Sequence, residues 1–459
     1  MSDKVFLVHG YSVKDTQAYQ ALHRRLAQYG YDLRSIYLGR YVSLDDQVTV
    51  SDVARAMHDE LKEHLGRAWG KERFHIITHS TGALVARRWI VEHYVGDFAA
   101  GKPLRNLIML AGPHFGSRLA HHGRSMLARA RVLGDTGRKI LNALELGSAF
   151  HWELNSQWCE PDTWKRKGIR PFCLTGARAD PGTLEKILMP ATGEDGSDGV
   201  VRVPSANLNH RRYEVDLTRS TARRAGEISG VPFGVLESYE HSGPETGIMN
   251  SITTQANRNN HQALRWILRC LDVSNAQGYR AMATSLDKVT KRTVAKRGSF
   301  AQLDFRIRDA DDDPIDDYSI VIGHPDPHSP RGELIPAKEI VDHTHRNRID
   351  GNHFTFFLDL RKLEKNKVYA LRITADANTP LISHEHAWFP TYKPENIERL
   401  VIGSQTTMVD VKMKRDPDPN LFVFHPADSG EPGPRADERP LHVKWDRTGE
   451  IVDYDLPWV

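Results

Sequence analysis

The sequence has few cysteines, no long apolar runs and almost no net charge. Its three cysteines, Cys159, Cys173 and Cys270, are too widely spaced for a disulfide framework or a zinc motif. No apolar run approaches the roughly 20 residues that cross a bilayer. The 62 basic and 59 acidic side chains nearly cancel, leaving +3, so the overall charge does not predict nucleic-acid binding. We expect no metal and no cofactor.

The first residues also lack the basic segment, apolar core and cleavage site of a secretory signal. The chain begins Met-Ser-Asp-Lys and passes directly into the apolar run Val5–Val8. We therefore expect a cytoplasmic protein, or one that is exported without a cleaved signal peptide.

Apolar strands alternate with amphipathic helices up to about residue 275. Strands are expected at Val5–Val8, 33–38, Phe74–Thr78, Leu104–Leu110, Pro171–Leu174 and Val231–Leu236, and helices at 15–29, 51–65, 83–93 and 260–271. This order predicts an α/β domain over 1–275 with a doubly wound, mostly parallel sheet. Residues 118–170 interrupt it with a basic, leucine-rich segment, which is either a helical cap or an extra packing layer. Residues 178–230 form a long polar connection.

The remainder of the chain has a different pattern. Short runs alternate apolar and polar residues between turn-forming residues, at Phe300–Ile307, Tyr318–Ile322, His353–Phe357, Tyr369–Ile373 and Met408–Met413. The pattern predicts an all-β, sandwich-like accessory domain over 297–416, after a linker at 276–296. We expect an accessory role for this domain, such as binding a protein partner, a surface or a secretion apparatus. A tail rich in Pro and Asp, 417–459, is expected to be loosely ordered.

The segment Phe74–Leu84 carries the clearest chemical signal. It reads Phe-His-Ile-Ile-Thr-His-Ser-Thr-Gly-Ala-Leu, a buried strand that turns through Ser80 into a helix. Such a turn exposes a serine, and the next amide, that of Thr81, can hold an oxyanion. Small residues flank the serine in such turns; Gly82 fits, whereas Thr78 stands where glycine is usual. A helix N-cap serine is the alternative interpretation.

Three further residues complete the predicted site. His9-Gly10-Tyr11 ends the first strand, so the amide of Tyr11 is the expected second oxyanion donor. The acid is expected at Asp198, in Ser197-Asp198-Gly199, with Asp195 and Glu194 as competitors. The base must follow the acid and the last strand. His241 does so, whereas His210 has no intervening strand and His261 opens the last helix.

Four segments in this order resemble the lipase/esterase branch of the α/β-hydrolase superfamily. They are His9-Gly10-Tyr11, Thr78–Gly82, Ala111-Gly112-Pro113-His114-Phe115-Gly116-Ser117 and Ser197–Ser205. The resemblance covers about residues 4–272. It implies the hydrolase fold, ester hydrolysis through an acyl-enzyme, and a cap over the site at 118–170.

The substrate is less sharply defined. The expected cap combines apolar side chains with several arginines, which suits an ester of a lipid and peripheral contact with a membrane. A soluble short-chain ester is one alternative. A phospholipase toxin delivered to neighbouring cells is another, and a hydrolase relative that only binds ligands or proteins is a third.

Overall fold

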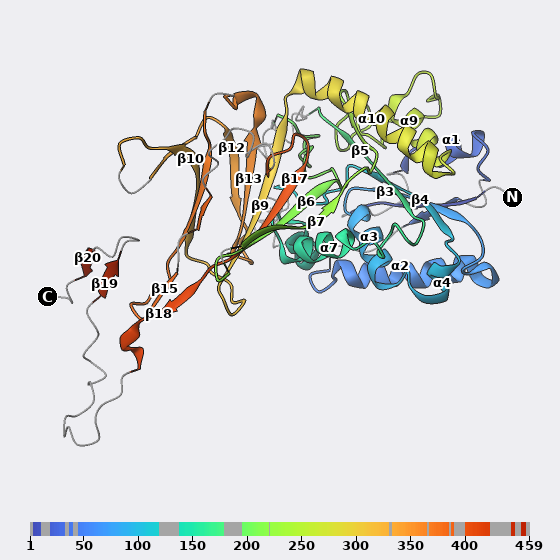
Figure 1. Cartoon of the computed structure of the whole chain (residues 1–459). Helices are drawn as coiled ribbons and strands as arrows, with labels where there is room; N and C mark the ends of the chain where they lie inside the picture. The colour runs from blue at the N-terminus through green and yellow to red at the C-terminus, as the bar shows by residue number, and fades with distance from the viewer. Residues whose placement is uncertain are drawn as a thin grey trace, which may run out of the picture.

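The computed structural model describes most of the chain as two bodies that lie side by side (Figure 1). The described residues are 3–10, 19–32, 36–39, 45–118, 137–178, 195–219, 221–329, 333–364, 367–384, 387–389, 400–422, 442–445 and 451–455. The first body is built on a parallel sheet and the second on antiparallel and mixed sheets.

A six-stranded sheet forms the centre of the first body. Its spatial order is β2 (Ile36–Gly39), β1 (Lys4–Val8), β3 (Phe74–His79), β4 (Leu104–Leu110), β5 (Arg170–Gly176) and β8 (Phe233–Leu236). Every pair of neighbours is parallel. The expected parallel sheet is confirmed. Because all the strands point the same way, their carboxyl ends meet at one edge, where such folds place their sites.

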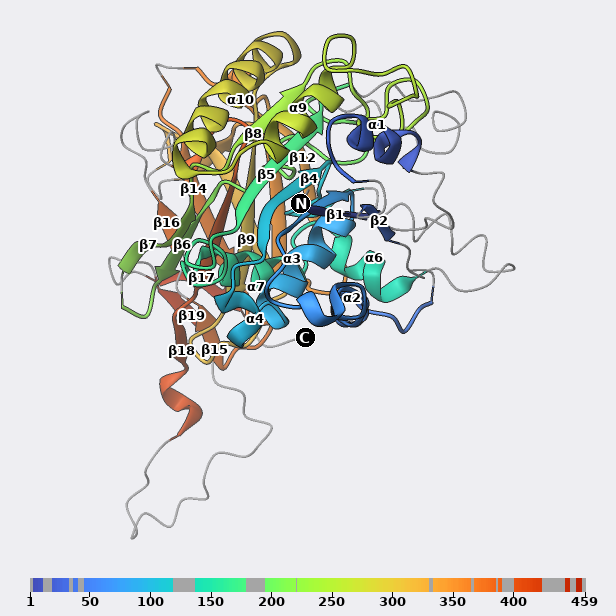
Figure 2. The same ribbon diagram turned by 90° about the vertical axis from the view of Figure 1, so that its right-hand side faces the viewer.

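Helices cover both faces of this sheet (Figure 2). One face packs against α2 (Val50–Leu65), α3 (Gly82–Glu92), α4 (Gly96–Ala100), α6 (Arg138–Leu144) and α7 (Ala149–Cys159). The other packs against α1 (Leu22–Gln28), α9 (Gln262–Leu271) and α10 (Ala276–Arg297). Helix α2 begins at a capping box, in which Thr49 and Asp52 bond reciprocally, as such sequences favour. Among the described residues, no helix is long and apolar enough to cross a membrane.

Helix α10 occupies the segment that the sequence predicted to be a linker. It packs along β8, where Thr290 Oγ accepts from the Val235 amide at 3.1 Å and Thr293 Oγ donates to the Val235 carbonyl at 2.8 Å. Only a narrow stripe is buried, with Met282 and Leu286 as its apolar members. Because half of this buried stripe is threonine, the sequence lacks the apolar periodicity that predicts a helix. The segment predicted to be a linker is a helix packed on the first body.

The second body is a β-sandwich, as expected. Its larger sheet has the order β12 (Val341–Arg346), β13 (His353–Asp359), β9 (Phe300–Arg308), β17 (Thr406–Lys412), β6 (His210–Asp216) and β7 (Thr221–Ile228). Its smaller sheet has the order β11 (Leu334–Pro336), β10 (Tyr318–Pro325), β14 (Ala370–Ala375) and β16 (Ala387–Phe389). Apolar side chains from both sheets form one core between them.

Strands β6 and β7 come from the long connection 178–230, not from the C-terminal part of the chain. β17 pairs in parallel with β6 on one side and with β9 on the other. The hairpin therefore completes the sandwich sheet, although it precedes β8 in sequence (Figure 1). The sequence analysis did not expect strands here because β7 reads Thr-Ala-Arg-Arg-Ala-Gly-Glu-Ile, and most of its residues are exposed or half-buried.

Short elements complete the described chain. Two-stranded ladders pair β15 (Ile382–His384) with β18 (Arg415–Pro417) and β19 (His442–Trp445) with β20 (Ile451–Asp455). Strands β19 and β20 lie in the tail that was expected to be loosely ordered. Three-residue 3-10 helices lie at Gly66–Ala68, Leu360–Lys362 and Pro419–Leu421.

The described part of the expected cap contributes to the contact between the two bodies. The loop between α6 and α7 carries Glu145, which is fully buried and accepts from His345 Nε2 and the Arg348 amide, both at 3.1 Å. Asn347 Nδ2 donates to the Leu146 carbonyl at 2.9 Å. Residues 119–136 lie outside the described residues, so a cap over the site remains a prediction.

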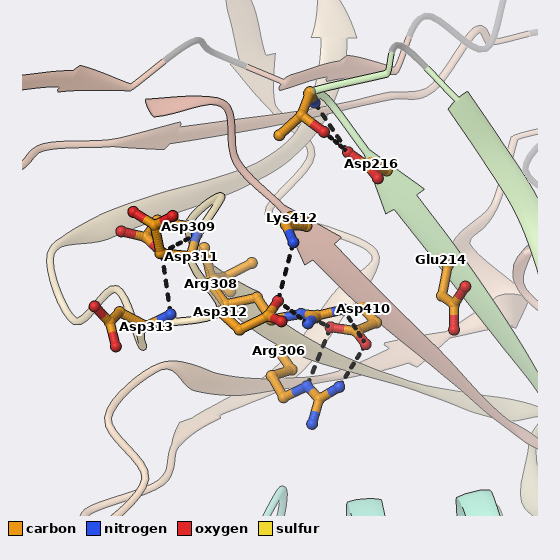
Figure 3. A network of polar contacts seen from close by, with 12 residues as sticks. Glu214, Asp216, Arg306, Arg308, Asp309, Asp311, Asp312, Asp313, Asp410 and Lys412 are labelled. Atoms are coloured by element: carbon orange, nitrogen blue, oxygen red, sulfur yellow. Dashed lines mark hydrogen bonds and ion pairs between the residues drawn. The ribbon is translucent and has the colours of Figure 1, made fainter. Parts of the chain in front are cut away.

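A buried carboxylate on β17 anchors the sandwich sheet to α7. Asp410 accepts from Arg306 at 2.5 and 3.1 Å and from Arg308 at 3.1 and 3.2 Å (Figure 3). The Arg306 guanidinium in turn lies 5.0 Å from the ring centre of Trp152 on α7. A buried charge is tolerated only with partners. The contacts from Asp410 through Arg306 to Trp152 therefore connect the sandwich sheet to α7.

Another buried carboxylate, Asp304 on β9, accepts hydrogen bonds from neutral side chains. Thr355 Oγ and Gln302 Nε2 donate to it at 2.8 and 2.9 Å. Burial raises the pKa of the Asp304 carboxyl from 3.8 to about 7, against the effect of these two hydrogen bonds. Gln302 also reaches the Phe115 carbonyl at 3.5 Å, so the group lies next to the first body.

Asp304→Asn is expected to remove part of the pH dependence of stability. The folded chain holds the Asp304 proton to a higher pH than the unfolded chain, so this group's contribution falls as pH rises from about 4 to about 7. Between about pH 5.5 and about pH 8.5 the loss is on the order of 2 kcal/mol. Denaturant unfolding of both proteins at these two pH values checks it. An identical pH dependence in the two proteins would contradict the assignment.

Candidate active site

Ser80 lies on a sharp turn between β3 and α3. Its φ is +55°, a left-handed conformation that is rare for a residue with a side chain. The Ser80 amide donates to the Leu110 carbonyl at the end of β4, at 2.9 Å. A Cβ on Gly82 would lie 2.5 Å from the Val8 carbonyl, so only glycine fits where the helix passes β1. These contacts hold Ser80 in its strained conformation above the carboxyl edge of the sheet.

The structure brings Ser80, His241 and Asp198 together in one chain of hydrogen bonds. Ser80 Oγ lies 3.0 Å from His241 Nε2, and His241 Nδ1 lies 3.1 Å from Asp198 Oδ2. Since the ionised carboxylate can only accept, Nδ1 carries the proton and Nε2 is free to accept from the serine. His241 and Asp198 are buried, whereas Ser80 is half-buried.

The loop at Asp198 holds the carboxylate in one orientation. Asp198 Oδ1 accepts from the amides of Val200 at 3.0 Å and Val201 at 2.8 Å. Oδ2, which faces the histidine, also accepts from Thr175 Oγ at 3.3 Å. The competitor Asp195 is largely exposed and pairs with Arg361 at 3.4 Å, and Glu194 lies outside the described residues. Of the two described carboxylates in this loop, only Asp198 is oriented toward the imidazole.

The two rival histidines make other contacts. His261 caps α9, because its Nδ1 accepts from the Leu264 amide at 3.2 Å and its Nε2 bonds Ser251 Oγ at 3.1 Å. His210 bonds the Leu208 carbonyl and Cys159 Sγ, at 2.9 and 3.4 Å. His241 instead follows β8 and is tied to the acid loop by its own amide, which donates to the Asp198 carbonyl at 2.8 Å.

Two further histidines lie behind the site, and the sequence analysis named their segments without giving either histidine a role. His79 Nε2 donates to the His241 carbonyl at 2.8 Å, and its ring centre lies 4.8 Å from that of His9. Burial lowers the pKa of His79 well below its usual value and that of His9 to about 4. Both rings are therefore neutral at neutral pH and place no positive charge next to His241. The signal was present in the sequence, because each histidine immediately precedes a site segment.

The residues expected to hold an oxyanion lie close to Ser80. Thr81 follows the serine at the start of α3 and is fully buried. A Cβ on Gly10 would lie 2.8 Å from Ser80 Cβ and 2.9 Å from the Thr81 nitrogen, so the end of β1 runs directly beside the elbow. Tyr11 itself lies outside the described residues, so its amide stays a predicted donor.

No metal site is found in the described part of the chain, where no group of three or more potential ligands gathers. Of the histidine-rich segment His384-Glu385-His386, only His384 is described. In the acidic loop at Asp309, the carboxylate accepts hydrogen bonds from its own loop: Asp309 Oδ1 accepts from the amides of Asp311 and Asp313 at 2.9 and 3.0 Å (Figure 3).

The parallel sheet, the elbow between β3 and α3, and the loops after β5 and β8 define the class. The chain has the fold of the α/β-hydrolase superfamily. Within that class it is similar to phospholipase PlaB from Legionella pneumophila, with 29% identity and a TM-score of 0.84 over 94% of this chain and 97% of that chain. The same phospholipase in complex with thio-NAD matches at 29% identity and a TM-score of 0.83, over 98% and 100%.

Another solved structure is less similar to this chain. Lipase BlEst2 from Bacillus licheniformis is 18% identical over 45% of this chain and 79% of its own, with a TM-score of 0.34, too low to support an argument. No protein-family model and no curated protein matches the chain. The similarity to a phospholipase over nearly the whole length of both chains supports a carboxylic-ester hydrolase.

Gly10→Ala is expected to lower ester hydrolysis about 100-fold, because the added Cβ would push the backbone at residue 10 away from Ser80 and Thr81. Gly278→Ala is the matched control: its Cβ would meet nothing closer than 3.4 Å, and it lies on α10. Hydrolysis of a p-nitrophenyl ester measures activity, and circular dichroism checks the fold. A folded Gly10→Ala protein with full activity would refute the predicted role of this turn.

Proposed function

We propose that the chain hydrolyses carboxylic esters of lipids through an acyl-enzyme on Ser80. The observation that carries this proposal is the continuous path of hydrogen bonds from Ser80 through His241 to Asp198. A nucleophile, a base in contact with it and an acid that orients the base are what acyl transfer requires. A relative that only binds ligands would need none of these contacts.

In the proposed mechanism, His241 Nε2 accepts the Ser80 proton as Oγ attacks the ester carbonyl. Asp198 keeps the proton on Nδ1 and stabilises the imidazolium that forms. The amides of Thr81 and Tyr11 donate to the oxyanion. His241 then protonates the leaving alcohol. A water molecule, deprotonated by the same nitrogen, attacks the acyl group and releases the acid and Ser80.

A phospholipid is the substrate class we favour, since the relative that matches nearly the whole chain is a phospholipase. The segment 118–170 combines leucines with arginines, which suits contact with acyl chains and phosphates at a membrane surface. We propose that this segment makes the peripheral membrane contact, and that the sandwich offers a surface to a protein partner. No nucleic acid is expected to bind.

Two alternatives follow from the same chemistry. A soluble esterase would prefer short acyl chains and would leave vesicles intact. A phospholipase effector would act on the membranes of neighbouring cells, in agreement with export that needs no cleaved signal. We propose a cytoplasmic location or this form of export.

Ser80→Ala is expected to abolish ester hydrolysis, lowering kcat by at least about 10⁴-fold, because the nucleophile is removed. The protein should remain folded and should no longer be labelled by a fluorophosphonate probe. Ser251→Ala is the matched control: Ser251 also bonds a histidine, at 3.1 Å, but lies outside the triad.

Substrate class is tested with p-nitrophenyl esters of short and long chains and with phosphatidylcholine vesicles. Release of fatty acid from vesicles by the wild-type protein, but not by Ser80→Ala, is the expected result. Hydrolysis of short esters alone would favour the soluble esterase. A folded Ser80→Ala protein that keeps its activity would rule out the mechanism.

A further inference from the structure

Asp198 lies at the tip of a short hairpin, residues 195–207, which we call the acid hairpin. The Val203 amide donates to the Gly196 carbonyl at 2.8 Å, and Ser197 and Arg202 form an antiparallel bridge. The tip between them carries Asp198 and the Val201 amide that binds its carboxylate. A shift of Arg202 would therefore move its neighbour Val201, and with it the carboxylate.

Arg202 does not point to solvent. Its side chain is 6% exposed, and Nη1 lies 2.5 Å from Asp342 Oδ2 on β12. The guanidinium also lies 4.4 Å from the ring centre of Phe357 on β13. Both partners belong to the sandwich. An arginine that is held by a carboxylate and stacked on a ring has little rotational freedom.

The rest of the acid hairpin also meets the sandwich. A Cβ on Gly196 would lie 2.3 Å from the Phe300 ring, so the start of β9 packs directly against the hairpin. Thr406 Oγ donates to the Pro204 carbonyl at 3.3 Å. Asn207 Nδ2 donates to the Ser404 carbonyl at 2.7 Å. Four sandwich segments therefore hold one hairpin.

The first body also holds this hairpin. Ser117 Oγ donates to the Val200 carbonyl at 2.5 Å, and Ser205 Oγ to the Gly116 carbonyl at 2.6 Å. Thr175 and the His241 amide bond Asp198 itself, whereas the Arg202 guanidinium is bound by Asp342 and Phe357 of the sandwich. The orientation of Asp198 thus depends on both bodies.

We propose that Arg202, held by Asp342 and Phe357, is a positioning residue for Asp198, and that the β-sandwich is thereby part of the catalytic machinery. The proposal rests on the proposed function, in which Asp198 orients His241. Arg202 makes no contact with the reacting atoms and acts only through the acid hairpin.

The test compares Arg202→Gln, Arg202→Lys and Asp342→Asn in the full chain. Arg202→Gln and Asp342→Asn are expected to lower kcat about tenfold to hundredfold with little change in KM, because the triad is misaligned while the substrate site is unchanged. Fluorophosphonate labelling of Ser80 should slow by a similar factor. Arg202→Lys keeps the charge but loses the planar stack, so its kcat should fall between wild type and Arg202→Gln.

The decisive measurement is Arg202→Gln in an Asp198→Asn background. If Arg202 acts through Asp198, the second substitution adds no further loss of kcat. A loss of folded protein would instead lower kcat equally in both backgrounds and would overturn the proposal. Arg415→Gln is the control, since it breaks a 2.9 Å arginine–aspartate pair within the sandwich, between Arg415 and Asp309. It should leave kcat unchanged.

The two proposals fail in different ways. Wild-type kcat in Arg202→Gln, with Ser80→Ala and Asp198→Asn both inactive, would remove the positioning role and leave the proposed function intact. Activity in a folded Ser80→Ala protein would remove the proposed function itself.

Discussion

The pairing of β17 with β6 on one side and β9 on the other is the constraint on which the rest of the structure depends. β6 and β7 lie between Asp198 and His241 in sequence, so the chain passes through the sandwich sheet on its way from the acid to the base. Both loops of the site are therefore attached to that sheet. Parallel pairing over seven residues on each side of β17 fixes this geometry far more firmly than a flexible linker could.

The elbow at Ser80 shows how the parallel sheet prepares the chemistry. A left-handed serine is tolerated because its amide is bonded to the end of β4 and its neighbour Gly82 fits against β1. Behind it, His9 and His79 are buried and neutral, so they pack as polar rings without charge. His79 bonds the backbone of His241 rather than its ring, which leaves the imidazole free to accept the Ser80 proton.

The sequence predicted the parallel sheet because each strand is a short apolar run, and periodicity reports such burial directly. It predicted Ser80, Asp198 and His241 because their chain order follows from the fold. It did not predict β7, where Arg223 pairs with Glu214 on β6 and Arg224 with Glu227 of the same strand, since a half-exposed strand loses the apolar signal. α10 was missed because threonines replace apolar residues on its buried face. The contacts of Arg202 could not be predicted, because its partners lie about 140 and 155 residues away in sequence.

The contact between the two bodies contains buried polar groups, and these groups disfavour separation of the two bodies. Glu145 is fully buried in this contact, where His345 and the Arg348 amide bind it. Arg306, which pairs with Asp410 inside the sandwich, lies over the Trp152 ring of the first body. Separation of the bodies would expose Glu145 and the Trp152 ring, and would leave the acid hairpin without Arg202's partners. Such an interface favours two bodies that stay together. The similarity to PlaB agrees with this view, because it spans both bodies rather than the hydrolase part alone. Under the proposed role of Arg202, an ester hydrolase whose acid is held in part by another sheet cannot vary that sheet freely, and the sandwich is constrained by catalysis as well as by any partner it binds.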